Sequence, residues 1–132
     1  MKNNNVISSL LLLSFALFIA ISCNKKIAPK LPSVTTNAVT NITSNTADCG
    51  GDVTDDGGES LLSRGICWGK SPNPTIYVKD SVTKEATNVG AFYSMMSNMA
   101  PQTKYYVRAY ASNSLGIAYG NQIAFSTLPS TK

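Results

Sequence analysis

The chain has no histidine among its 132 residues. Histidine is the side chain that most often acts as a general base and as the activator of a nucleophile, so its absence argues against catalysis. The acidic residues carry no motif that would bring two carboxylates together, apart from a turn at Asp55 and Asp56. Two thiols without histidine make a poor metal site. We therefore expect a protein that is not an enzyme and that holds no cofactor and no metal ion.

Charge is also scarce, at 14% of residues, and it is unevenly placed. Four of the eleven basic residues, Lys2, Lys25, Lys26 and Lys30, precede Leu31. The seven that follow are balanced by seven acidic residues. A neutral body lacks the basic surface that binds phosphate backbones. We therefore expect no nucleic-acid partner.

No stretch of the chain shows the apolar spacing of an amphipathic helix. Short runs with a period of two, separated by Gly, Pro, Asn and Asp, indicate strands and turns instead. Asp55-Asp56-Gly57-Gly58 predicts a hairpin turn, because Asp-Gly suits the positive φ of such turns. The sequence thus predicts an all-β sandwich of about seven strands. The expected strands are Ser33–Val39, Ala47–Thr54, Leu61–Gly69, Thr75–Lys79, Ala91–Ser97, Tyr105–Ser112 and Gln122–Thr127.

The N-terminal segment is built like a secretion signal. Lys2 and the free amine supply positive charge, and an apolar run extends from Val6 to Ile21. This run is short for a membrane span of about 20 residues. Ala20-Ile21-Ser22-Cys23 resembles the lipobox of bacterial lipoproteins, whose cysteine is acylated after the signal is cut just before it. We expect lipidation of Cys23, with ordinary signal-peptidase cleavage and an uncleaved helix as the alternatives.

The lipobox resemblance implies a location for the protein. A single acyl chain is a weak anchor, whereas two or three, palmitate among them, hold firmly. Lys25, Lys26 and Lys30 lie where basic residues favour anionic headgroups. Asn24, rather than an aspartate, follows the cysteine, which in the resembling lipoproteins favours the outer membrane. We expect a lipid-anchored protein of the cell envelope with a signal peptide at 1–22, a lipidated tether at 23–31, a domain at 32–128 and a tail at 129–132.

Several different short motifs follow one another along the body of the chain. They are Cys49-Gly50-Gly51-Asp52-Val53-Thr54, Asp56-Gly57-Gly58, Arg64-Gly65-Ile66-Cys67-Trp68, Pro101 to Ala111, Asn113-Ser114-Leu115-Gly116 and Ala118-Tyr119-Gly120-Asn121. Together they resemble the fibronectin type III-like repeat of extracytoplasmic lipoproteins in Gram-negative bacteria, in a single copy. The resemblance implies an immunoglobulin-like β-sandwich.

Pro101 to Tyr105 is similar to the tyrosine corner of such sandwiches, in which the phenol bonds to upstream backbone. Alternation then directs Tyr105, Val107, Ala109 and Ala111 inward. The residues expected to face them are Val53, Phe92, Met96, Met99, Ile123 and Phe125.

Cys49 and Cys67 fall on neighbouring expected strands, in an oxidising compartment where a disulfide can persist. A bond requires both side chains to point the same way. Alternation places Cys49 inward, but Ile66 and Trp68 compete with Cys67 for the core. A disulfide and a pair of free thiols both remain open.

If Tyr105 points inward, Tyr106, Arg108 and Tyr110 form an outward stripe. Such a stripe can stack on sugar rings or receive a protein, or it can simply stabilise an exposed sheet through cross-strand pairs. Trp68 and Tyr119 complete the candidate surface, the latter within a loop expected at 113–120, and sandwich loops carry recognition.

Two short acidic motifs have simpler alternatives. Asp80-Ser81-Val82 resembles the O-glycosylation acceptor of some Gram-negative lineages, so Ser81 is either a modification site or part of an ordinary loop. Asp55, Asp56 and Glu59 lack the alternating ligand spacing of a calcium loop and indicate a hairpin turn.

These features predict a membrane-anchored extracytoplasmic lipoprotein. We expect it to act as a non-catalytic interaction or spacer module whose partners are the membrane, through the lipid, and a protein or a glycan. The alternative is a structural subunit of a larger cell-envelope complex with no ligand of its own.

Overall fold

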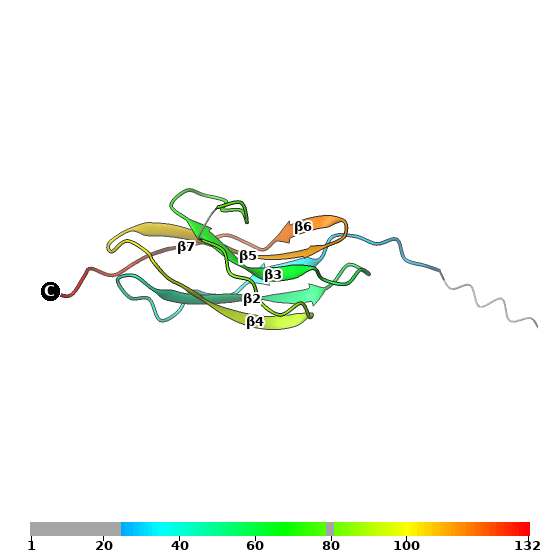
Figure 1. Ribbon diagram of the computed structural model, residues 1–132, viewed down its shortest axis with the longest axis horizontal. Helices are drawn as coiled ribbons and strands as arrows, with labels where there is room; N and C mark the ends of the chain where they lie inside the picture. The colour runs from blue at the N-terminus through cyan, green and yellow to red at the C-terminus, as the bar shows by residue number, and fades with distance from the viewer. Residues whose placement is uncertain (1–24, 79–80) are drawn as a thin grey trace, which may run out of the picture.

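The computed structural model describes residues 25–78 and 81–132. Within these ranges the chain forms seven strands in two facing sheets and no helix, which confirms the predicted all-β sandwich (Figure 1). Sheet A has the order β1-β2-β4, and sheet B is built around β5. The strands of sheet A are β1 (Ser33–Thr36), β2 (Ala47–Asp55) and β4 (Gly90–Met96). Those of sheet B are β3 (Ser63–Gly69), β5 (Lys104–Asn113), β6 (Gly116–Tyr119) and β7 (Ile123–Ser126).

The core lies between the two sheets, and β5 supplies its central row. The four alternating residues predicted to face inward are at most 5% exposed: Tyr105, Val107, Ala109 and Ala111. Of the residues predicted to face them, five are buried and Ile123 is partly buried against them. Alternation along β5 therefore placed the core side chains as expected.

The tyrosine corner is formed as predicted. The Ala100 amide donates a hydrogen bond of 2.8 Å to the Tyr105 hydroxyl. The Tyr105 ring stacks on Phe125 of β7 with 6.1 Å between the ring centroids. The phenol thus fastens the loop before β5 to the strand itself.

Two strands, β6 and β7, pair with the edge of β5 that faces away from β3. Between them β1 contacts the same edge. β6 pairs with residues 110–113 of β5, and β7 pairs with residues 104–107. In the gap, the Thr36 hydroxyl accepts the Ala109 amide at 2.9 Å, and the Thr36 amide donates to Asn121 Oδ1 at 2.9 Å. A Cβ atom on Gly120 would lie 2.6 Å from Thr36 Oγ1, so this approach requires glycine.

The structure differs from the sequence prediction in one expected strand and one expected loop. Residues 75–78 of the expected strand Thr75–Lys79 form a turn, closed by a bond from the Val78 amide to the Thr75 carbonyl. The expected loop at 113–120 contains β6, which joins β5 through a two-residue turn with Asn113 opposite Gly116. The turn was missed because Ser114-Leu115 carries no Asn-Gly or Asp-Gly signal.

Replacing Tyr105 by phenylalanine tests the tyrosine corner. The Tyr105→Phe variant keeps the ring but leaves the Ala100 amide without its acceptor, so we expect the free energy of unfolding in urea to fall by about 1–2 kcal/mol. Tyr106→Phe is the matched control, because the half-buried Tyr106 hydroxyl makes no hydrogen bond to any described residue. Equal stability of the two variants would contradict the role given to the corner.

Candidate functional site

The expected lipidation site lies outside the described residues. Cys23 and the segment 1–22 precede the first described residue, so the lipid anchor stays a prediction. In the described part of the chain, no helix combines the length and apolar character needed to span a bilayer.

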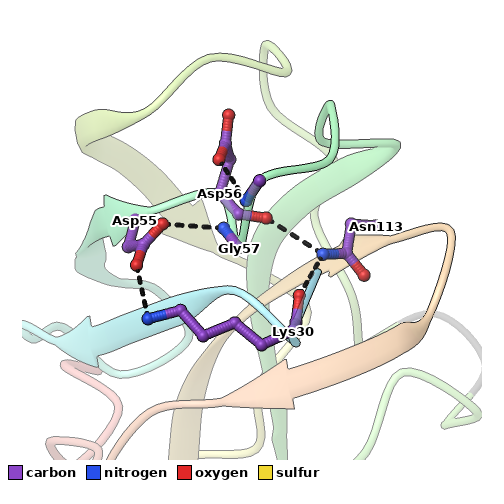
Figure 2. A network of polar contacts seen from close by, with 6 residues as sticks. Lys30, Asp55, Asp56, Gly57 and Asn113 are labelled. Carbon is purple, nitrogen blue, oxygen red and sulfur yellow. Dashed lines mark hydrogen bonds and ion pairs between the residues drawn. The ribbon is translucent and has the colours of Figure 1, made fainter. Parts of the chain in front are cut away.

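Lys30 fastens the end of the expected tether to the sandwich, as Figure 2 shows. Its amide donates to the Gly57 carbonyl at 2.9 Å, and its carbonyl accepts the side-chain amide of Asn113 at 2.7 Å. Its ammonium forms an ion pair of 2.7 Å with Asp55. We call this set of contacts, with Asp56, the Lys30 clamp. Through it the N-terminal segment is joined to both the β2–β3 turn and the end of β5.

The acids of the β2–β3 turn are used by the turn itself. Asp55 accepts the Gly57 amide at 2.8 Å and Asp56 accepts the Gly58 amide at 2.8 Å. The hydrogen bond from the Lys30 ammonium, reinforced by the Gly57 amide, lowers the pKa of the Asp55 carboxyl. Gly57 has φ +82°, and a Cβ atom there would meet the Lys30 carbonyl at 2.0 Å. The predicted hairpin is nevertheless wrong. β2 and β3 do not pair with each other but belong to different sheets, so Asp55 to Gly58 form a connection that crosses from sheet A to sheet B.

The predicted outward stripe on β5 is largely covered. Tyr110 is 3% exposed and its hydroxyl donates to the Thr83 carbonyl at 2.7 Å. Trp68, 5% exposed, belongs to the core cluster. The prediction that Tyr110 faces a partner is therefore wrong, and Trp68 is packed in the core with only a small part of its side chain exposed. Tyr106 stays half-buried, with the Lys104 ammonium 5.4 Å from its ring centroid.

The segment that covers this face of sheet B comprises residues 73–78 and 81–85, and we call it the covering segment. Arg108 and Tyr119 hold it in place. Arg108 Nε donates to the Pro74 carbonyl at 2.9 Å, and its guanidinium carbon lies 4.2 Å from the centroid of the Tyr119 ring. The Tyr119 hydroxyl accepts the Ile76 amide at 3.2 Å. Two residues that the sequence suggested for ligand binding thus bind the chain's own backbone. Pro72 and Pro74 lack amide donors, so this part of the segment does not pair as a regular strand.

The covering segment continues along the open edge of β3. The Thr83 and Glu85 amides donate to the Ile66 and Arg64 carbonyls at 2.9 and 2.8 Å. The Trp68 amide donates to the Ser81 carbonyl at 3.0 Å. Residues 81–85 therefore supply irregular strand pairing that covers the edge. Covered edges do not recruit further strands.

Ser81 lies half-buried in this segment, and the O-glycosylation expected there stays a prediction. It also borders a hollow of about 390 Å³, which we call the Trp68 hollow. The hollow is lined by Trp68, Gly69, Lys70, Val78, Ser81, Ser97, Asn98, Ala100 and Tyr105. Its lining includes the aromatic residues Trp68 and Tyr105 and the polar residues Lys70, Ser81, Ser97 and Asn98.

The Trp68 hollow and the Lys30 clamp lie at opposite ends of the sandwich. Tyr105 near the start of β5 lines the hollow, and Asn113 at its end belongs to the clamp. Eight residues of strand separate them by roughly 26 Å. Figure 1 shows the same polarity, with the N-terminal segment leaving at one end and the C terminus at the other. Sequence reasoning missed the hollow because its residues come from four separate stretches of the chain.

Cys49 and Cys67 are free and buried, and they lie on opposite sides of sheet B. Cys49 belongs to the core cluster, whereas Cys67 lies beneath the covering segment with its Sγ 3.4 Å from the Pro74 carbonyl. Their strands belong to different sheets, so the expectation of adjacent strands is wrong. Ile66 and Trp68 occupy the core instead of Cys67. The sequence left both a disulfide and a pair of free thiols open, and in this structure the two thiols are free.

No protein-family model matches the chain, and no curated protein matches it in sequence. Solved structures do match its fold. The sensor domain of the anti-sigma factor RsgI4 of Pseudobacteroides cellulosolvens superposes with a TM-score of 0.56 at 18% identity, covering 78% of this chain and 100% of that one.

Human fibronectin type III domains are similar to the same degree. The third such domain of the KIAA0343 protein gives a TM-score of 0.54 at 16% identity, over 80% of this chain and 90% of that one. The sixth domain of fibronectin type III domain containing protein 3 gives 0.52 at 19% identity, over 80% and 92%. These similarities establish a fibronectin type III-like fold, as the sequence motifs implied.

The two buried thiols should resist alkylation in the folded protein. Burial raises the pKa of each from 9.0 to about 11, so at pH 8 almost no thiolate is present. We expect iodoacetamide to modify neither Cys49 nor Cys67 at pH 8, and to modify both in urea, as counted by mass spectrometry. Between pH 9 and pH 11 the folded thiols keep protons that the unfolded chain loses, so their contribution to stability falls over that window. A mass lower by two hydrogen atoms and no alkylation of these residues in urea would reveal a disulfide instead.

Proposed function

We propose that this protein is a non-catalytic recognition module of the cell envelope. Acyl chains on Cys23 hold it at the outer membrane, and the Trp68 hollow receives a protein or a glycan. The observation that carries the proposal is the polarity of the sandwich, with the Lys30 clamp at one end and the hollow at the other. A module fastened to a membrane at one end is free to bind a partner at the opposite end.

The chemistry of the hollow supports recognition. Binding sites typically combine apolar surface with a few placed polar groups. Here the apolar parts are Trp68, Tyr105 and Val78, and the polar groups include the Asn98 amide and the Lys70 ammonium. Tyr77, the chain neighbour of Val78, is 82% exposed and offers an aromatic ring to a partner. This mixture suits a sugar face or a peptide with alternating apolar and polar groups.

The reactive groups of the described residues support a non-catalytic role. Cys49 and Cys67 are buried with raised pKa values, which disfavours the thiolate needed of a nucleophile. Glu85 accepts a hydrogen bond of 2.6 Å from Ser94 and joins the covering segment to β4. Arg64, 4% exposed, donates to the Gly90 carbonyl at 3.0 Å and lies over the Phe92 ring. Each of these groups has a structural partner within the fold.

One observation favours the second candidate, a structural subunit of a larger envelope complex. On β4, at the edge of sheet A, Tyr93 and Met95 are 61% and 60% exposed. Exposed aromatic and methionine side chains are enriched in protein–protein interfaces. A flat face of this kind suits a permanent protein neighbour better than a small glycan.

The anchor is tested by mass spectrometry of the protein from the membrane fraction. We expect a mature chain that begins at Cys23 and carries acyl groups, and incorporation of labelled palmitate in growing cells. The Cys23→Ala variant should keep its leader and incorporate no label. A mature chain with an unmodified N-terminal cysteine, or one found in the soluble fraction, would contradict lipid anchoring.

The recognition surface is tested by comparing two exposed tyrosines. In full-length protein, we expect Tyr77→Ala to weaken binding to an envelope glycan or protein by about 5- to 30-fold, or about 1–2 kcal/mol. Binding is measured against fractionated envelope glycans and by cross-linking to envelope proteins in cells. Tyr93→Ala is the matched control and should leave this binding unchanged. The reverse pattern, with loss only in Tyr93→Ala, would favour the structural subunit.

A further inference from the structure

We propose that the clamp end of the sandwich lies against the lipid bilayer, so that the domain stands end-on upon the membrane. The inference rests on the membrane attachment at Cys23 proposed above and adds an orientation and a second contact to it. The occupant of this surface is the lipid headgroup and upper acyl region. The residues that carry the inference belong to the tether, the β2–β3 connection and the β5–β6 turn.

Four large apolar side chains are exposed at this end. They are Ile27, Leu31, Leu62 and Leu115, with exposed fractions of 85%, 44%, 62% and 52%. Leu31 approaches the β5–β6 turn, with a methyl carbon 3.3 Å from the position of a Cβ on Gly116. The Leu62 amide donates to the Ser112 carbonyl at 2.8 Å, close to the same turn. Four separate points of the chain thus place apolar groups at one end of the molecule.

The chain outside the described residues ends beside this surface. Ile27 and Ala28 line a hollow of about 260 Å³ together with the β2–β3 connection, Asp55 to Gly58, so the tether already lies beside the domain at Ile27. Only Asn24, Lys25 and Lys26 separate this contact from Cys23. Four peptide units extend at most about 14 Å, which is less than the length of the sandwich. A bilayer that holds Cys23 is therefore within reach of the clamp end and out of reach of the far end.

The charges at this end permit close approach to a membrane. Lys25, Lys26 and Lys30 are matched in number by Asp55, Asp56 and Glu59. Asp55 is paired with Lys30. Lys25 and Lys26 lie two and three residues after Cys23, where basic side chains favour anionic headgroups. The end therefore carries no net charge that would repel an anionic surface.

A matched pair of labelling sites tests the orientation. Leu115 at the clamp end and Leu128 after β7, at the far end, are both 52% exposed. Full-length Leu115→Cys and Leu128→Cys proteins are labelled with the same thiol-reactive fluorophore and reconstituted into vesicles of phosphatidylethanolamine and phosphatidylglycerol. Some of the lipid carries a nitroxide on its upper acyl chain as the quencher. Cys49 and Cys67 are buried, so wild-type protein reports any labelling of Cys23 alone.

We expect the label at position 115 to be quenched at least about three-fold more than the label at position 128, because only the former enters the headgroup region. Equal quenching of the two labels, in protein that floats with the vesicles, overturns the orientation and leaves the anchor intact. Energy transfer between labels at position 115 without lipid quenching assigns this end to a second copy of the chain, and also overturns it. Protein that does not float and whose wild-type form is labelled at Cys23 overturns the anchor and the orientation together.

A second variant covers the case in which a label at position 115 disturbs the β5–β6 turn. Leu62→Cys places the same fluorophore at the same end on a different connection. Urea unfolding of each labelled protein confirms that the sandwich is intact. Strong quenching at position 62 supports the orientation, and quenching no greater than at position 128 overturns it.

Discussion

The antiparallel pairing of β3 with β5 determines where the candidate functional side chains lie. Its register sets Trp68 opposite Val107, facing the core, and Cys67 opposite Arg108, facing away from it. A slip of one residue would exchange these two faces. The tyrosine corner fixes which face of β5 points inward, because the Tyr105 hydroxyl accepts the Ala100 amide of the loop before the strand.

The covering segment gives a physical reason for the Arg64-Gly65 part of the sequence motif. A Cβ on Gly65 would lie 2.2 Å from the Thr83 carbonyl, so the segment can approach β3 only beside glycine. This approach lets Tyr110 bond to Thr83 and Arg108 bond to Pro74. Tyr110 and Arg108, which alternation directs away from the core, thereby hold the covering segment against sheet B. The molecule presents its hollow where this layer ends, near Trp68.

The two ends of the sandwich are linked by β5 and differ in chemistry. At the clamp end, main-chain and ionic contacts of Lys30 join the N-terminal segment to the β2–β3 turn and to Asn113. At the far end, the Trp68 hollow is lined by the aromatic residues Trp68 and Tyr105 together with small and polar residues. The clamp therefore joins the N-terminal segment to the same folded body whose opposite end carries the hollow.

The sequence by itself determined the sandwich, six of the seven strands, the tyrosine corner and the inward row of β5, because each depends on local periodicity and on a motif within one segment. It also carries the lipobox-like segment before Asn24. Only the tertiary structure decided the positions of Tyr110 and Cys67, because the covering segment lies over them, and of Trp68, because the sheet register turns it into the core. The Trp68 hollow and the Lys30 clamp were likewise decided only by the tertiary structure. Each joins residues far apart in sequence, and their proximity follows from sheet register and packing rather than from any local pattern.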